Sequence, residues 1–156
     1  MADLRRLAGD LGLSDVSTYL QSGNVVFESR ASARTLAGKL EREIRERLGH
    51  DVSVLLRSKD HLAKVMAGNP FAAKDVSKLY VTFLAKPPRK ERVAALEPAV
   101  GAPDEFRVNG REIYLHFPGG YGRSQLSNAY FEKQLGVIAT TRNWKTVTSL
   151  AKLARA

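Results

Sequence analysis

One order of residue patterns occurs twice in this chain, and that repeat limits its fold more than any other feature. In the first half, residues 4–12 place apolar side chains at helical spacing and end at a glycine. Two β-rich runs within residues 16–27 then surround Ser22-Gly23-Asn24, and residues 32–49 return to helical spacing. These patterns predict a helix, a hairpin and a second helix.

The first half continues with a strand and a helix. Residues 51–56 alternate as a half-buried strand does, and Ser58 is a suitable cap for a short helix. The polar stretch 73–77 then has the composition of a connection. We therefore expect an N-terminal domain at residues 1–72 and a C-terminal domain at residues 73–156.

The second half repeats the order after an additional strand. Residues 79–84 are apolar on both sides, as in a central strand, and residues 89–96 predict a short helix. A hairpin is expected around Asn109-Gly110, and Ser124 is expected to cap the helix that Gly136 ends.

The last elements complete the repeat. A short strand is expected at residues 137–139, and Thr140 or Thr141 is expected to cap a final helix. The order strand, helix, strand, strand, helix, strand is the ferredoxin-like arrangement. The chain is therefore predicted to be an α+β protein of two ferredoxin-like (βαββαβ-type) subdomains with antiparallel sheets. The first lacks its leading strand, and the second has an extra C-terminal helix.

The composition limits the cellular compartment and the kinds of site that the chain can contain. The chain has no cysteine, which excludes disulfides, thiolate-bound zinc and a thiol nucleophile and favours the reducing cytoplasm. No apolar run approaches the length of a membrane span, so no membrane anchor is expected. We expect no metal and no cofactor, because the three histidines lie in different elements and the phosphate-loop, dinucleotide and HExxH motifs are missing.

The net charge of +9 is concentrated in the second half. Residues 78–156 contain 13 basic and 6 acidic side chains, whereas residues 1–77 contain 12 and 10. A basic surface attracts anionic ligands or polyanions, although a purely solubilising role is an equal alternative.

Two segments are candidate anion sites. In Gly119-Gly120-Tyr121-Gly122-Arg123-Ser124, glycines allow close backbone approach, Arg123 can bind an anion, and the expected helix begins at Ser124. In Thr140-Thr141-Arg142-Asn143-Trp144, hydroxyls, an amide and a guanidinium surround a second expected helix start. The alternatives are that the glycines only make a turn, that the polar residues are ordinary caps and that Trp144 packs in the core.

Three passages resemble one known family: residues 18–27 (TYLQSGNVVF), Asn69-Pro70-Phe71, and residues 139–147 (ATTRNWKTV). Together they resemble the bacterial family called domain of unknown function 1697. The resemblance implies two ferredoxin-like subdomains in a cytoplasmic protein of no established activity. It also implies that relatives begin with a strand and a glycine-containing loop ahead of the position of Met1.

Three functions are compatible with these features. The first is a non-catalytic module that binds an anionic ligand, either a phosphorylated metabolite or a nucleic acid stacked on Tyr114, Tyr121 and Trp144. The second is an enzyme for a phosphorylated or carboxylated small molecule, with Arg123 and Arg142 as clamps. The third is an interaction protein that self-associates through a sheet edge exposed by the missing strand.

Overall fold

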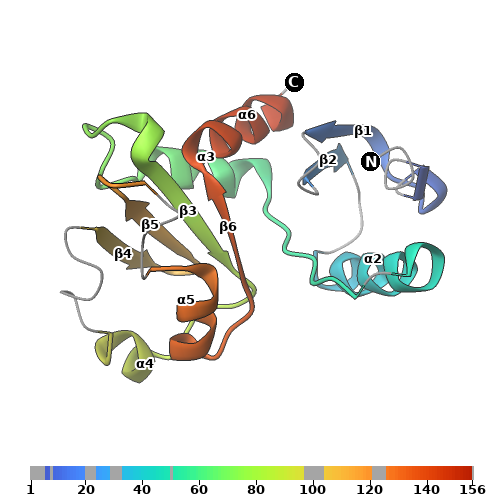
Figure 1. The fold of residues 1–156 in the computed structure, drawn as a ribbon. Helices are drawn as coiled ribbons and strands as arrows, with labels where there is room; N and C mark the ends of the chain where they lie inside the picture. Colours follow the sequence, from blue (N-terminus) through green and yellow to red (C-terminus); the bar gives the residue numbers. More distant parts are fainter. Residues whose placement is uncertain are drawn as a thin grey trace. The chain divides into compact units, whose positions relative to one another are not determined.

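The computed structural model of the protein describes residues 6–7, 9–19, 24–28, 33–49, 51–96, 104–120 and 126–155. The chain divides into two compact units, residues 1–61 with 149–156 and residues 62–148 (Figure 1). Residues 62–72 therefore group with the second unit, whereas the sequence pattern placed the boundary between residues 72 and 73. The two-domain assignment at that boundary stays a prediction.

The first unit contains the predicted hairpin and helix. Strand β1 (Ser14–Tyr19) pairs antiparallel with β2 (Asn24–Glu28), and helix α2 spans Ala33–Leu48. The helix periodicity is explained by a small core in which the buried apolar side chains of α2 meet those of the preceding segment: Leu7, Leu13, Leu36, Leu40 and Ile44. Ser22 and Gly23 of the predicted turn and Ser32, the first residue of the predicted helix, lie outside the described residues.

The predicted strand at residues 51–56 is wrong. This segment has no regular structure, and the described strands of the first unit form a two-stranded sheet. The backbone amide of Val54 donates to Glu41 Oε1 at 2.9 Å, so a side chain of α2 replaces a neighbouring strand. Apolar alternation was present because Val54 and Leu56 pack on the core of the unit, not because they belong to a sheet.

Helix α3 (Lys59–Ala67) begins as predicted. The hydroxyl of Ser58 accepts a hydrogen bond from the His61 amide at 3.1 Å, which is the geometry of an N-cap. The helix ends where the amide of Gly68 donates a hydrogen bond to Lys64 O at 2.9 Å.

The second unit contains a four-stranded antiparallel sheet, which makes this part of the protein mixed α+β. After the short 3-10 helix η1 (Val76–Lys78) the chain runs through β3 (Leu79–Leu84), α4 (Lys90–Ala94), β4 (Glu105–Asn109), β5 (Glu112–His116), α5 (Asn128–Leu135), β6 (Ala139–Asn143) and α6 (Trp144–Arg155). The strands lie in the order β4-β5-β3-β6, so β3 is central and β6 is an edge strand.

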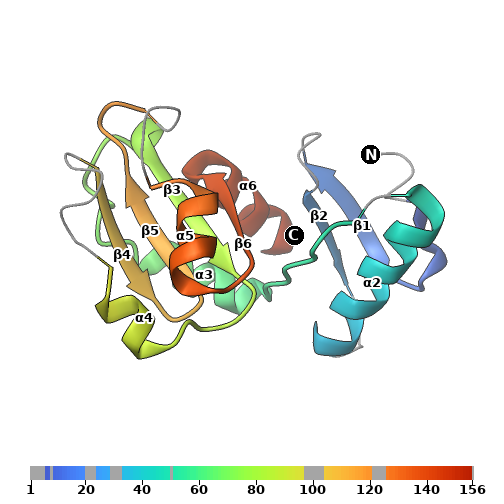
Figure 2. The same cartoon turned by 60° about the horizontal axis from the view of Figure 1, so that its bottom comes forward.

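Helices lie on both faces of this sheet (Figure 2). On one face, α4 and α5 cover a core of ten buried residues: Leu84, Leu96, Ile113, Leu115, Phe117, Leu126, Phe131, Leu135, Val137 and Ala139. On the other face, the buried Tyr114 donates a hydrogen bond to Val65 O of α3 at 2.8 Å. Because side chains alternate along a strand, consecutive residues of β3 and β5 enter two different buried layers. This explains the continuous apolar run at residues 79–84.

Two predicted helix starts need correction. Helix α5 is capped by Ser127, whose hydroxyl accepts from the Tyr130 amide at 3.1 Å, and not by Ser124, although Gly136 ends the helix with φ 67° as expected. Thr140 and Thr141 do not cap α6, because both belong to β6. Asn143 Oδ1 accepts from the Thr146 amide at 2.8 Å and takes that role. Asn143, like Thr140 and Thr141, has a side chain that can cap a helix. The two threonines are β-branched, and β-branched residues favour a strand.

None of the helices in the described ranges combines the length and apolar character that crossing a bilayer requires.

Candidate anion-binding site

Four of the five residues of the predicted site at 140–144 belong to β6, and several of their polar side chains bond within the protein. Thr141 Oγ1 lies 2.7 Å from Thr82 Oγ1 on the neighbouring strand and donates to Asn128 Oδ1 of α5 at 3.2 Å. Asn128 Nδ2 in turn donates to Ala139 O at 2.9 Å, and the Ala139 amide donates to Glu132 Oε2 at 3.0 Å. These bonds fasten α5 to β6, so Thr141 has a structural partner on both sides.

The guanidinium of Arg142 forms hydrogen bonds with residues of its own strand. One guanidinium nitrogen, Nη1, donates to Thr140 Oγ1 at 2.7 Å and to Thr141 O at 2.9 Å. The side chain is half-buried, and this burial lowers the pKa of the guanidinium because the charged form loses hydration. Arg142 therefore stands in a strand at the sheet edge and not at the start of a helix.

The other candidates separate into two groups. Asn143 serves as the cap already described, and Trp144 is the first residue of α6 with a partly buried side chain. Tyr121, Arg123 and Ser124 lie outside the described residues. The use of Arg123 and Arg142 as two clamps on one small molecule stays a prediction.

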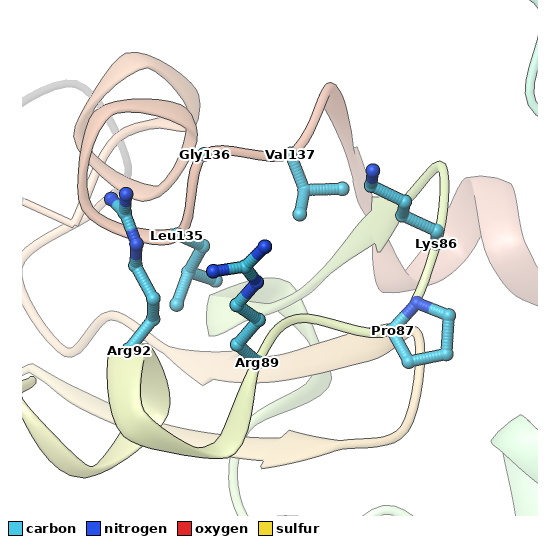
Figure 3. A pocket seen from close by; sticks show the side chains of 7 residues that line it. All are labelled: Lys86, Pro87, Arg89, Arg92, Leu135, Gly136 and Val137. Carbon is cyan, nitrogen blue, oxygen red and sulfur yellow. The ribbon is translucent and has the colours of Figure 1, made fainter.

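A different group of cations surrounds a hollow in the second unit. The hollow has a volume of about 440 Å³ and lies between the connection from β3 to α4 and the turn after α5. Its lining residues are Lys86, Pro87, Arg89, Arg92, Leu135, Gly136 and Val137. Figure 3 shows the guanidinium groups of Arg89 and Arg92 extending toward the turn after α5, with Lys86 beside them. Sequence reasoning missed this site.

Local structure positions these three cations. Pro87 and Pro88 end β3 because proline cannot continue the ladder of hydrogen bonds, and they lead directly into the short helix α4. Arg89 is the N-cap residue of α4, with an extended backbone, and its carbonyl accepts from the Arg92 amide at 3.1 Å. Both side chains point to the same side of α4 (Figure 3). The wall opposite is made by the end of α5.

Arg92 has a second role at that wall. Its Nη1 donates to Gln134 O at 3.3 Å, so it supports one of the carbonyl groups left without a partner at the end of α5. The neighbouring Gly136 has φ 67°, a conformation that favours glycine at the end of a helix. Arg92 therefore has a fixed anchor, and its positive charge lies at the negative end of the helix dipole.

Lys86 and Arg89 have no such anchor. Both side chains are exposed, and within the described ranges no carboxylate forms an ion pair with Lys86, Arg89 or Arg92. Glu91 lines a second, more open hollow together with Arg89, Lys90 and Arg92. One feature of the sequence could have indicated this site: four of the seven residues from 86 to 92 are basic.

Other clusters in the described part of the chain are smaller. His116 Nδ1 lies 3.2 Å from Glu105 Oε1 across β4 and β5, and its ring is 6.0 Å from that of Phe71. The described residues contain no group of three or more His, Cys, Asp or Glu side chains that could hold a metal ion. The hollow beside α4 is thus the strongest candidate in the second unit.

Comparisons with known proteins bear on the fold. A family model described as "Protein of unknown function (DUF1697)" matches residues 1–114. The solved structure of the conserved bacterial protein SP0830 from Streptococcus pneumoniae is similar, with a TM-score of 0.77 and 21% sequence identity over 99% of this chain and 88% of that chain. At this identity the likeness shows the fold alone. No curated protein is similar enough in sequence to match.

Proposed function

The chain belongs to the family described as "Protein of unknown function (DUF1697)", and we propose that it is a non-catalytic module that binds an anionic ligand in the hollow beside α4. The family resemblance predicted from three passages is confirmed, and the match covers the cations of the hollow at residues 86–92. The cytoplasm is the proposed location, on the ground that the chain has no cysteine.

One observation carries the proposal: three cations line a single hollow without a carboxylate paired to them among the described residues. Like charges that gather without counter-charges repel one another, and a bound anion relieves this repulsion. A guanidinium offers a planar fork of donors that fits carboxylate or phosphate oxygens in pairs.

The lining favours binding over catalysis. The described lining residues include no histidine, carboxylate, hydroxyl or thiol that could move a proton or attack a substrate. An enzyme that clamps its substrate with Arg142 is less well supported, because that guanidinium already bonds to Thr140 and Thr141.

We also propose that the second unit has the ferredoxin-like fold. The order β3, α4, β4, β5, α5, β6 and the spatial order β4-β5-β3-β6 support this assignment. The hollow would then lie at the connection that leaves the first strand of the motif. The described residues of the first unit form only a two-stranded sheet, so support for a second ferredoxin-like subdomain is limited to the sequence pattern.

The anion site predicted around Arg142, with Tyr121, Arg123, Ser124, Thr140, Thr141, Asn143 and Trp144, is the competing location. A pair of matched substitutions separates the two. Arg89→Gln removes a guanidinium from the hollow, and Arg142→Gln removes one from β6, so each changes the net charge equally.

The test measures binding of inorganic pyrophosphate and of a short single-stranded DNA by calorimetry at low and high salt. We expect Arg89→Gln to weaken binding by about tenfold or more and Arg142→Gln to leave it within about twofold, since a lost charge-assisted hydrogen bond is worth about 1.5–3 kcal/mol. The reverse ranking would move the site to β6. No binding of either probe to the unaltered protein would refute the proposed function.

A further inference from the structure

We infer that the hollow binds the terminal phosphoryl group of a small molecule and not the backbone of a nucleic acid. This inference rests on the proposed function, because it names the ligand class of the same site. Three features of the second unit support it: the covered sheet, the positive charges in one short segment, and the size and lining of the hollow.

The sheet offers no stacking platform for bases in the described residues. Proteins that bind single strands on a sheet stack bases on exposed aromatic rings. Here the aromatic rings on the α4/α5 face pack on one another, with centroids 5.3 Å apart for Tyr80 and Phe117 and 5.6 Å for Phe106 and Phe131. On the opposite face Tyr114 is 2% exposed and bonded to α3. Both faces of the sheet are therefore occupied by the protein's own helices.

The positive charge is gathered at one point. A strand of nucleic acid needs cations spread along several phosphates, because each phosphate contact displaces a counterion. Lys86, Arg89 and Arg92 instead come from one segment of seven residues and line one hollow. Glu91 of α4 interrupts the positive surface next to it. This arrangement suits a single phosphoryl group.

The hollow also has the size of a small-molecule site. Its volume of about 440 Å³ falls within the range of about 300–1,000 Å³ that such sites occupy. Two separate segments wall it, and the apolar residues Pro87, Leu135 and Val137 line it together with the cations.

The roles of the two arginines differ. Arg92 is anchored on Gln134 O, and this bond orients its guanidinium beside the hollow. Arg89 is exposed and has no such bond, so its fork is free to bind two phosphoryl oxygens. Arg89 is therefore the ligand-contacting residue, and Arg92 both contacts the ligand and holds the wall.

The experiment compares phenyl phosphate, a monoester, with an oligothymidylate, whose internal phosphates are diesters. A monoester gains its second negative charge with a pKa of about 6, whereas a diester has no second ionisation. The charged residues that line the hollow are Lys86, Arg89 and Arg92. On the two elements beside it, the other charged residues are Lys90 and Glu91 of α4 and Glu132 and Lys133 of α5.

We expect phenyl phosphate to bind more tightly by about fivefold or more as the pH rises from about 5.5 to about 7.5, because the dianion is the ligand. Arg89→Gln should weaken this binding by about tenfold or more, and Arg89→Lys should weaken it by several-fold, since the charge stays but the fork is lost. The matched control is Arg107→Gln on β4, an exposed arginine on the α3 face of the sheet, and it should leave binding unchanged.

The outcomes separate the two levels of the proposal. If the oligothymidylate binds through Arg89 and phenyl phosphate does not, the ligand class is wrong and the anion-binding function stands. If phenyl phosphate binds equally well to the Arg89→Gln variant, the hollow is not the binding site. Both the proposed anion-binding site and its proposed ligand class are then wrong. Binding of phenyl phosphate that does not change with pH would also overturn the assignment of a dianionic phosphoryl group.

Discussion

Arg142 on β6 and Arg89 beside α4 belong to the same unit and have opposite surroundings. Arg142 is half-buried and bonds to Thr140 and Thr141, two residues of its own strand. Arg89 is exposed, lines a hollow with two other cations and has no ion pair with a described carboxylate. The difference teaches that an arginine near polar residues in sequence is not by itself available to a ligand. Availability depends on whether the fold supplies acceptors.

The comparison extends to the polar residues of each region. On β6, Thr141, Asn128, Glu132 and Thr82 form one network that joins α5 to the sheet. Beside α4, Lys86 and Arg89 have no described partner, and only Arg92 is anchored. Substitutions in the first region should therefore change stability, and substitutions in the second should change binding.

The largest expected effect on stability is that of Asn128→Ala. This change removes the donor to Ala139 O and the acceptor for Thr141 Oγ1, so we expect the free energy of unfolding to fall by about 2–3 kcal/mol. Denaturant unfolding measures the change. Gln134→Ala on the exposed side of α5 is the matched control, with an expected change within about 0.5 kcal/mol. Equal effects of the two substitutions would show that the network contributes nothing.

Tyr114→Phe tests a buried polar group outside both regions. Its hydroxyl donates to Val65 O near the end of α3, and removing it leaves that carbonyl without this donor. We expect a loss of about 1–2 kcal/mol, with Tyr130→Phe as the control because no hydrogen bond of the Tyr130 hydroxyl is described.

The Tyr114→Phe substitution should also change how the stability of the protein depends on pH. Burial, followed by the nearby charge of Glu112, raises the pKa of Tyr114 above its usual value of 10.0. A group with a raised pKa in the folded state contributes stability that is complete below pH 10 and is lost as the pH rises through the folded-state value. The Tyr114→Phe variant should therefore lose less stability above pH 10 than the unaltered protein does. A parallel decline of both proteins would contradict this prediction.

The smallest expected effect is that of Glu91→Gln in α4. Removing this exposed negative charge beside Arg89 and Arg92 should strengthen phosphate binding by about twofold at low salt and have no effect at high salt. Its control is Glu105→Gln on β4, which removes a charge paired with His116 and should leave binding unchanged. A gain that persists at high salt would indicate a change in shape and not in charge.

Local patterns predicted most elements of the second unit and failed at the starts of α5 and α6 and at the bounds of β6, which was expected at residues 137–139 and spans Ala139–Asn143. The hairpin at Asn109-Gly110 and the end of α5 at Gly136 form as expected, because each turn places a glycine at positive φ. The starts of α5 and α6 were displaced by about one turn. Several serines, threonines and asparagines near each start can all act as caps, and only packing selects Ser127 and Asn143.

The functional site was harder to predict than the fold. Tyr121, Arg123, Ser124 and residues 140–144 were selected because they lie at the starts of expected helices. In the structure Asn143 and Trp144 begin α6, whereas Thr140 and Thr141 lie further back in β6. The basic segment at residues 86–92 was visible in the sequence, but its opposite wall comes from Leu135, Gly136 and Val137. No local pattern could indicate that these segments meet.

The amino-acid sequence by itself determined the order of elements in the second unit, the absence of cysteine, the positive charge and the family. These depend on spacing, turn residues and composition, which act over a few residues. The tertiary structure decided that residues 51–56 stay outside a sheet, that Arg142 is engaged and that Arg89 and Arg92 share a hollow with the end of α5. Those outcomes depend on which distant groups become neighbours, because a hydrogen bond or a cavity wall requires partners that only the folded chain brings together.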